Sequence, residues 1–218
     1  MPNNTDTRVS IEGPLYIIDA MTTKLKECTK HNGTTKEIGF LETFVGDPAN
    51  KLLEEDRNKK DADGMPYWYE SRINGWGTKW DVYHVSLVER KFFPAHAGFD
   101  AYAQVTCVWN TAWSPCMPAM RTLSRLYDLI IKLDYVDEGL FYVGHTTIIN
   151  GKDNLVRDYS GKDVYQGIYE LFGSERFFEF FQESLYEPDY SEEILEAAKK
   201  FVTEPHYKKL VKVLSKEE

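Results

Sequence analysis

The sequence predicts an α+β protein, in which a mainly antiparallel sheet carries helices on one face and a helical extension follows at the C-terminus. Three observations point to this fold class. The first 45 residues read as strand, helix and strand, the middle of the chain holds several segments of alternating polarity, and the last quarter has a helical pattern. The expected domains are residues 1–160, an α+β domain with a polar loop at 46–66, and residues 161–218, the helical extension.

The N-terminal third is expected to begin with a short strand. Val9 and Ile11 alternate with polar neighbours before a Gly-Pro pair ends the segment. Apolar residues near helical spacing predict a helix over 15–30, and a second strand is expected over 38–45. Residues 46–66 mix basic and acidic side chains, which favours a solvated loop with at most one helical turn.

The middle third supplies most of the predicted sheet. A short aromatic helix at 67–72 and a turn at 75–77 precede it. Residues rich in β-formers then predict four strands, at 79–88, 101–111, 139–149 and 152–159. The last two are joined by Asn150-Gly151, which is the strongest short hairpin signal in a sequence. We therefore expect these two strands to pair with each other.

One helix is predicted within the sheet region and three after it. Ser114-Pro115 marks the start of the first, since serine is a good N-cap and proline is preset for the first helical position. After residue 160, three helical segments are separated by Gly173-Ser174 and by Pro188. The apolar stripe expected on the first helix consists of Met120, Leu123, Leu126, Ile130 and Leu133.

Glutamates repeat at every fourth position of the middle C-terminal helix. On a helix, Glu175, Glu179, Glu183 and Glu187 would form one stripe about three turns long. Two interpretations stay open. The stripe is either the solvated face of a docked helix, or a surface that presents regularly spaced negative charge to a basic protein, as a nucleic-acid mimic would.

Composition narrows the class of protein. The chain has 218 residues, a formal charge of −9 and 14% aromatic residues, which supplies enough apolar mass for a core and argues against disorder. The acid excess argues against direct DNA binding, and no apolar run is long enough to span a membrane. Three dispersed cysteines and an N-terminus unlike a secretory signal favour the cytoplasm.

Motifs of common enzymes are missing from the sequence. We find no glycine-rich nucleotide motif, no nucleophile elbow and no zinc-protease helix. The five histidines are scattered, and none has a partner at metal-ligand spacing. Cys116 lies near a predicted helix start, where the pKa of a thiol falls, but it has no evident base partner, so a packed thiol is favoured. We expect a non-enzymatic protein without catalytic residues, metal or cofactor.

Two tryptophan-rich segments give the best local signal for a binding site. In the first, flexible glycines accompany Trp76, Lys79, Trp80 and Asp81, and in the second Trp113 precedes the predicted helix. If their strands are neighbours, both clusters gather at one helix N-terminus, where backbone amides favour an anion. The tryptophans either cap the core or line a pocket for a ligand or partner.

These segments, together with others nearer the N-terminus, resemble a known family. The residues that carry the resemblance are Met1-Pro2-Asn3, Arg8 to Gly13, Trp68-Tyr69, Asn74, Trp76 to Asp81 and Thr111 to Pro115. They are similar to the YubB-like (Api-like) ferredoxin-domain family, which phages, plasmids and bacteria carrying them encode. The resemblance implies a ferredoxin-like fold, a term for topology and not for an iron–sulfur cluster. It implies no reaction, because a fold alone does not name a function.

We draw two expectations for function. The first is an accessory protein of a phage or other mobile element that binds and inhibits a host protein, such as a nucleic-acid-binding defence component, through its acidic or aromatic surface. The second is a binder that sequesters a nucleotide signal in a tryptophan-lined pocket, where stacking and one cation would recognise the nucleotide.

Overall fold

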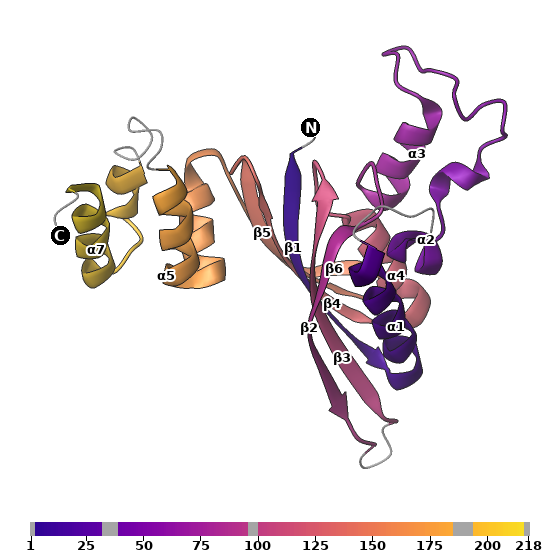
Figure 1. Cartoon of the computed structure of the whole chain (residues 1–218), viewed down its shortest axis with the longest axis horizontal. Coiled ribbons are helices and arrows are strands. Elements are labelled where there is room, and N and C mark those ends of the chain that lie inside the picture. The colour runs from indigo at the N-terminus through magenta and orange to yellow at the C-terminus, as the bar shows by residue number, and fades with distance from the viewer. Residues whose placement is uncertain (1–2, 32–38, 96–99, 185–193, 216–218) are drawn as a thin grey trace. The chain divides into compact units, whose positions relative to one another are not determined.

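A six-stranded sheet organises the computed structural model, which describes residues 3–31, 39–95, 100–184 and 194–215 (Figure 1). The strands are β1 (Asn4–Pro14), β2 (Tyr83–Phe93), β3 (Tyr102–Ala112), β4 (Ile130–Asp137), β5 (Tyr142–Ile149) and β6 (Lys152–Ser160). The helices are α1 (Leu15–His31), α2 (Phe40–Phe44), η1 (Pro48–Lys51), α3 (Tyr67–Trp76), α4 (Met117–Tyr127), η2 (Gly161–Asp163), α5 (Val164–Ser184) and α7 (Glu204–Ser215).

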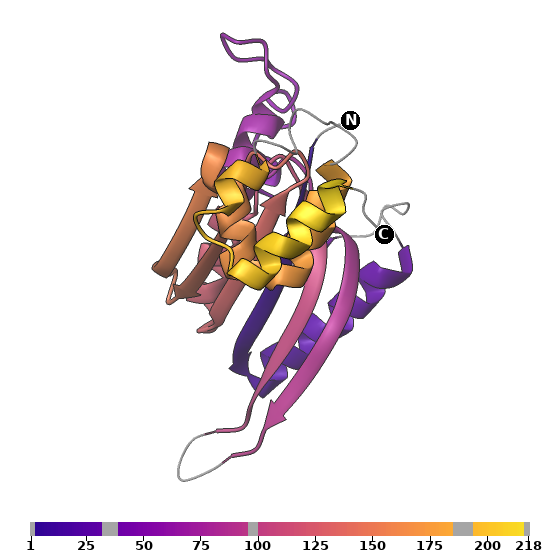
Figure 2. The same cartoon turned by 90° about the vertical axis from the view of Figure 1, so that its left-hand side faces the viewer.

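The ferredoxin-like α+β fold expected from the resemblance is confirmed by the topology. The sheet order is β2-β3-β1-β4-β5-β6, and β1 pairs antiparallel with both β3 and β4 while β2 pairs antiparallel with β3. With α1 after β1 and α4 after β3, the first four strands give the βαββαβ arrangement. Figure 2 shows β2 and β3 side by side, and they pair as long antiparallel strands. The segment that holds α2, η1 and α3 is inserted between α1 and β2.

Strand register explains why helices cover one face of this sheet. Opposed residues of antiparallel strands point to the same face. One face is buried throughout, and Figure 1 shows α1 and α4 on one side of β1 to β4. Its residues are Thr7, Val9 and Ile11 of β1, Val105, Cys107 and Trp109 of β3, and Ile131, Leu133 and Tyr135 of β4. The opposite face carries charged residues that are exposed, among them Asp6, Arg8 and Lys132.

The strand expected over 38–45 is wrong, because the described part of this segment forms helix α2. Tertiary contacts decide its conformation. The carboxylate of Asp81 accepts hydrogen bonds from the amides of Leu41 (2.9 Å) and Glu42 (2.8 Å), so it caps the helix from 40 residues away. Phe40 and Leu41 are fully buried. Neither interaction can be read from the local pattern.

The helix expected to continue to Leu133 is also wrong in its second half. Helix α4 ends at Tyr127, and Asp128 adopts a left-handed conformation (φ 54°) at its C-cap. The chain then enters β4, where Leu133 is buried in the sheet and not on a helix. Leu126, expected in the buried stripe, is 56% exposed. Met120 and Leu123 are buried as expected.

Other boundaries shift by a few residues. The turn expected at 75–77 begins later, since α3 runs to Trp76 and only Gly77 leaves the helix. The hairpin at Asn150-Gly151 is confirmed, and its two residues have the positive φ angles (51° and 74°) that a tight hairpin turn requires. The break at Gly173-Ser174 is present as a non-helical Gly173 within α5. Pro188 lies outside the described residues.

The chain divides into two compact units. The first comprises residues 1–139 and 145–156, and the second comprises residues 140–144 and 157–218. The boundary expected at residue 160 stays a prediction. Within the described residues, none of the helices combines the length and the apolar character needed to cross a bilayer.

Candidate functional site

Two loops meet at one end of the first unit's sheet, as the tryptophan-rich segments predict. The hydroxyl of Thr78 donates to the carbonyl of Ala112 and accepts from its amide, both at 3.1 Å. The Ser114 hydroxyl donates to the Gly77 carbonyl. A Cβ on Gly77 would lie 2.4 Å from Cδ of Pro118, so only glycine permits this approach to the start of α4.

The tryptophans at this junction separate into buried and exposed rings. Trp76 and Trp109 are 1% and 2% exposed, whereas Trp80 and Trp113 are 38% and 51% exposed. The Trp76 indole N–H donates to the carbonyl of Gly46 (2.9 Å). The structure therefore places Trp76 in the core, because burial leaves its ring no surface for a ligand or partner. Trp80 and Trp113 keep such a surface.

Lys79 and Tyr83 extend the exposed aromatic surface. The Lys79 ammonium lies 4.8 Å from the Trp80 ring and 5.9 Å from the Tyr69 ring. Trp80 meets Tyr83 edge-on, with ring centroids 6.4 Å apart. We call Lys79, Trp80, Tyr83 and Trp113 the aromatic edge. Sequence reasoning missed Tyr83, although its place in a predicted strand next to the tryptophan segment was the available signal.

The start of β1 links both ends of the aromatic edge. The Tyr83 hydroxyl donates to Oδ1 of Asn4 (2.5 Å), and the amide of Trp113 donates to the carbonyl of Asn3 (2.9 Å). Burial raises the pKa of the Tyr83 hydroxyl, so it stays a donor. Trp113 has a positive φ of 70°, which is unusual for a bulky residue. Its backbone is thus held in place by the surrounding bonds.

Asp81 supports the aromatic edge through backbone hydrogen bonds and is only partly exposed. Besides capping α2, its carboxylate accepts from the amide of Val82 (2.7 Å). A Cβ on Gly39 would lie 2.3 Å from Asp81 Oδ2, so the carboxylate is tightly enclosed. Desolvation raises the pKa of Asp81 to about 6, although its three backbone hydrogen bonds oppose that rise. Both carboxylate oxygens accept backbone hydrogen bonds, which supports a structural role for Asp81.

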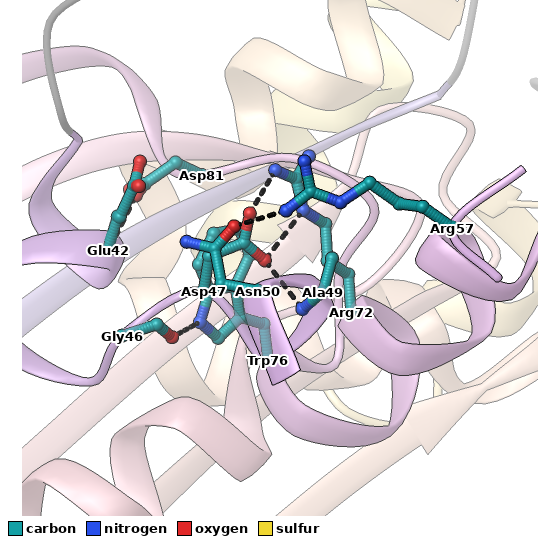
Figure 3. A network of polar contacts seen from close by, with 9 residues as sticks. All are labelled: Glu42, Gly46, Asp47, Ala49, Asn50, Arg57, Arg72, Trp76 and Asp81. Atoms are coloured by element: carbon teal, nitrogen blue, oxygen red, sulfur yellow. Dashed lines mark hydrogen bonds and ion pairs between the residues drawn. The ribbon is translucent and has the colours of Figure 1, made fainter. Parts of the chain in front are cut away.

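An ion-pair network fixes the inserted segment beside this region (Figure 3). The Arg72 guanidinium donates to both carboxylate oxygens of Asp47, at 3.1 and 2.5 Å, and its Cζ lies 5.6 and 5.0 Å from the ring centroids of Trp68 and Trp76. Burial alone would raise the pKa of Asp47, but hydrogen bonds from Arg72 and from the Ala49 amide outweigh it and lower the pKa.

Sequence reasoning missed this pair. The charged loop at 46–66 gave no sign that one carboxylate would be almost buried, with 6% of the Asp47 side chain exposed. The available signal was Asp47-Pro48, since an N-cap residue followed by proline marks a helix start. Asp47 does cap η1, by accepting from the Ala49 amide at 2.9 Å.

Burial also decides the state of Cys116. This residue is the N-cap of α4, where a helix terminus would lower the pKa of a thiol. It is fully buried, and desolvation raises its pKa to about 12. The thiol therefore stays protonated, as the interpretation of a packed cysteine requires.

The acidic stripe is only partly described. Glu175 and Glu179 lie exposed on α5, and Glu179 accepts from Arg176 at 2.7 Å. The side chain of Glu183 and the whole of Glu187 lie outside the described residues. Phe177 and Phe178, on the same helix, are buried. The two described glutamates thus face solvent from a helix anchored by phenylalanines.

A histidine on the polar sheet face has two partners. His145 Nδ1 lies 2.6 Å from Oδ1 of Asp134, and its Nε2 lies 3.2 Å from the Thr147 hydroxyl. These contacts satisfy both ring nitrogens. No group of three His, Cys, Asp or Glu side chains suited to a metal ion is found among the residues that the structure describes.

Comparison with known proteins supports the fold of part of the chain. Residues 90–175 match the family model described as the ferredoxin-like domain in Api92-like protein. The chain is also similar to the crystal structure of a protein api92 from Yersinia pseudotuberculosis, at 10% identity and a TM-score of 0.40. That similarity covers 74% of this chain and 99% of the other. None of the curated proteins matches the chain.

Proposed function

We propose that the chain is an Api92-like accessory protein of a phage or other mobile genetic element. In this proposal it acts in the host cytoplasm, where it binds and inhibits a host protein and catalyses no reaction. The match of residues 90–175 to the ferredoxin-like domain supports the family assignment. The proposed partner is a basic, nucleic-acid-binding defence component, and the chain itself binds neither DNA nor membranes.

The observation that carries this proposal is the pair of exposed, backbone-fixed indoles in the aromatic edge. Trp80 and Trp113 are 38% and 51% exposed. Leaving large apolar rings in water is unfavourable, and the fold itself gives no reason for it. A bulky residue at positive φ, such as Trp113, costs on the order of 1–3 kcal/mol and clusters at functional sites. Rigid tryptophans are also the most frequent hot spots of protein interfaces.

The negative net charge of the chain supports the proposal of a basic partner. The formal charge of the chain is −9, and Glu175 and Glu179 add exposed carboxylates on α5. An acidic surface raises the rate of encounter with a basic protein and suppresses binding to nucleic acid. The partner would therefore dock on tryptophans and be steered by carboxylates.

One observation favours the nucleotide binder as a second candidate. The Lys79 ammonium lies 4.8 Å from the exposed Trp80 ring, so stacking and a cation are offered together. The burial of Trp76 removes one proposed wall of the pocket. A nucleotide would then bind against Trp80 and Trp113 alone.

The test is affinity purification from host cells, with proteins and small molecules both identified by mass spectrometry. Wild-type protein is compared with Trp80→Ala/Trp113→Ala, and the matched control is Phe92→Ala, which removes a 52% exposed aromatic ring from β2. We expect the tryptophan variant to lose a host protein that the wild type and the Phe92 variant retain. Thermal unfolding checks that all three proteins are folded.

Other outcomes separate the candidates. A nucleotide recovered with the wild type, and lost in the tryptophan variant, would favour the second candidate. Equal recovery of every partner by all three proteins would contradict a binding role for the aromatic edge. Turnover of a recovered molecule by the pure protein would overturn the non-enzymatic proposal.

A further inference from the structure

Strand β2, which belongs to the first compact unit, forms one edge of the sheet. Among the described strands it pairs with β3 alone. An edge strand presents a row of backbone N–H and C=O groups that can pair with a further strand, and natural proteins interrupt such edges with charges or bulges. Both irregular positions of β2 lie before Glu89, and the register with β3 is continuous from Glu89 to Phe93. This continuous stretch has the backbone geometry to accept another strand.

The side chains around this stretch are arranged symmetrically about Arg90. Glu89 and Lys91 flank it with opposite charges, and their side chains are 47% and 51% exposed. Two positions away on either side lie apolar residues, Val88 and Phe92, which are 48% and 52% exposed. A strand turned by 180° about the central arginine thus sets each of these charges against its opposite and each apolar residue against the other. This complementarity specifies one partner, a second copy of the same chain.

We propose that β2 pairs antiparallel with β2 of a second copy about a two-fold axis at Arg90, so that the two sheets join into one. Glu89 then lies opposite Lys91 of the partner subunit, and Val88 lies opposite Phe92 of the partner subunit. The two-fold axis repeats both pairs. Opposite charges and apolar residues in directly opposed positions stabilise antiparallel sheets, whereas like charges there destabilise them.

An ion pair within each chain prepares the charges for this pairing. Lys91 Nζ lies 3.0 Å from Oε2 of Glu89, which is two positions away and on the same face of the strand. When two copies pair, these four side chains form a square in which every neighbour, along or across the strands, has the opposite charge. The pair within each chain is kept, and two pairs between the chains are added.

Arg90 lies opposite itself at the axis, and Asp19 of α1 offsets the repulsion. The Arg90 guanidinium donates to the carboxylate of Asp19 in its own chain. The Asp19 side chain is 53% exposed, and a carboxylate has further lone pairs, so it can also accept from Arg90 of the partner subunit. Two guanidiniums and two carboxylates then balance at the centre of the interface.

The charges select this register over its neighbours. A two-fold axis perpendicular to the sheet must pass through one residue position of β2, because opposed residues point to the same face. Moving the axis by one or two residues in either direction would leave Glu89 or Lys91 opposite an apolar residue of the second copy. Parallel in-register pairing would place every charge opposite itself. The axis at Arg90 therefore pairs both flanking charges with their opposites, which the neighbouring registers do not.

The aromatic edge lies outside the paired stretch. Tyr83 is the first residue of β2 and Trp80 precedes the strand, whereas the pairing centres on Arg90 and extends toward Phe93. The dimer is therefore independent of the host protein proposed to bind the aromatic edge, and either proposal can fail without the other. Phe92→Ala is expected to weaken the dimer and to retain the host protein, because the two surfaces are separate.

The test measures oligomeric state by sedimentation velocity over a range of concentrations. We expect the wild type to dimerise, and Glu89→Lys alone or Lys91→Glu alone to raise the dissociation constant about tenfold or more, because each change makes all four charges of the square alike. Mixing the two single variants restores association, since each cation then meets a carboxylate across the strands. Combining both changes in one chain also restores the dimer, which a merely destabilised strand would not do.

A matched control makes the same charge change on another strand. Lys132→Glu alters an exposed residue of β4 and is expected to leave the dimer unchanged. Circular dichroism shows that each variant is folded. A wild type that is monomeric at every concentration would overturn the proposal. A dimer that neither single variant weakens, or single variants that fail to associate when mixed, would contradict it equally.

Discussion

At the scale of single residues, Asp81 connects the chemistry of one carboxyl to the position of the exposed Trp80 beside it. Three backbone amides, of Leu41, Glu42 and Val82, donate to its carboxylate at 2.7 to 2.9 Å. These bonds fix the chain directly after Trp80 and hold α2 against it. The enclosure has an electrostatic cost, since desolvation raises the pKa of Asp81 to about 6.

This pKa predicts a pH dependence of stability. The folded protein binds the Asp81 proton more tightly than the unfolded chain, whose carboxyl has a pKa near 3.8. The contribution of Asp81 to the free energy of unfolding is therefore largest below about pH 4 and falls as the pH rises to about 6. Two pKa units correspond to roughly 3 kcal/mol. We expect Asp81→Asn to remove this fall.

Urea unfolding at several pH values measures the effect as a difference between variant and wild type. The exposed Glu54→Gln serves as control, because removing an exposed carboxyl should leave the curve of the wild type nearly unchanged. Parallel curves for the wild type and Asp81→Asn between pH 4 and 6 would show that Asp81 is not desolvated as described. The Asn side chain retains one acceptor oxygen, so the variant keeps part of the cap.

Individual tryptophans show how far residue types alone can predict a site. The sequence predicted correctly that two tryptophan segments would meet at the start of a helix, since their flanking strands are antiparallel neighbours. It did not distinguish Trp76 from Trp80. That distinction depends on the Gly46 carbonyl, which accepts from the Trp76 indole across 30 positions of sequence. The spacing of neighbouring residues in the sequence cannot predict a contact over that separation.

At the scale of elements, the structure follows the sequence where the periodic signal is local. The strand β1, helix α1 and the hairpin at Asn150-Gly151 form where their patterns predict them. The predictions failed at α2 and β4. In β4, Ile130 and Leu133 also fit a helical stripe continuing α4, and only the left-handed Asp128 ends the helix between them. Short apolar runs are ambiguous between helix and strand for this reason.

The inserted segment around η1 and α3 depends on one ion pair, which gives a prediction at this scale. We expect Arg72→Met to lower the free energy of unfolding by about 3 kcal/mol, because it leaves the nearly buried Asp47 carboxylate without its charged partner. The change also removes the cation–π contacts of the guanidinium with Trp68 and Trp76. Chemical denaturation of the whole chain measures the loss.

The matched control is Arg90→Met. Arg90 pairs with Asp19, whose side chain is 53% exposed, so water replaces the lost partner and the expected loss is below about 1 kcal/mol. Equal losses in the two variants would contradict a special role for the Asp47–Arg72 pair. Arg72→Lys separates charge from geometry, because lysine keeps the positive charge but cannot donate to both carboxylate oxygens in a fork.

At the scale of the whole molecule, register and burial together determine the architecture. The buried face of β1, β3 and β4 needs helices over it, and the chain supplies α1 and α4 after alternate strands. The α+β class and the single covered face were predictable from hydrophobic alternation. The strand order was not, because several orders bury the same residues. The ferredoxin-like order was expected only through the family resemblance, which rests on several segments that include residues 76–81 and 111–115.

The net charge of the whole chain yields a prediction about binding kinetics. With a formal charge of −9, the protein is expected to associate with a basic partner several-fold faster at low salt than at high salt, since ions screen charges beyond about 10 Å at 0.1 M. The dissociation rate should change little with salt, because it depends on Trp80 and Trp113, which the partner covers in the complex. Stopped-flow association with the host protein recovered by affinity purification measures both rates.

Glu175→Gln/Glu179→Gln is expected to flatten the salt dependence, whereas Trp80→Ala should raise the dissociation rate and leave the salt dependence intact. An association rate independent of salt would show that carboxylates do not steer the encounter, and the acidic surface would then be only a solvated face.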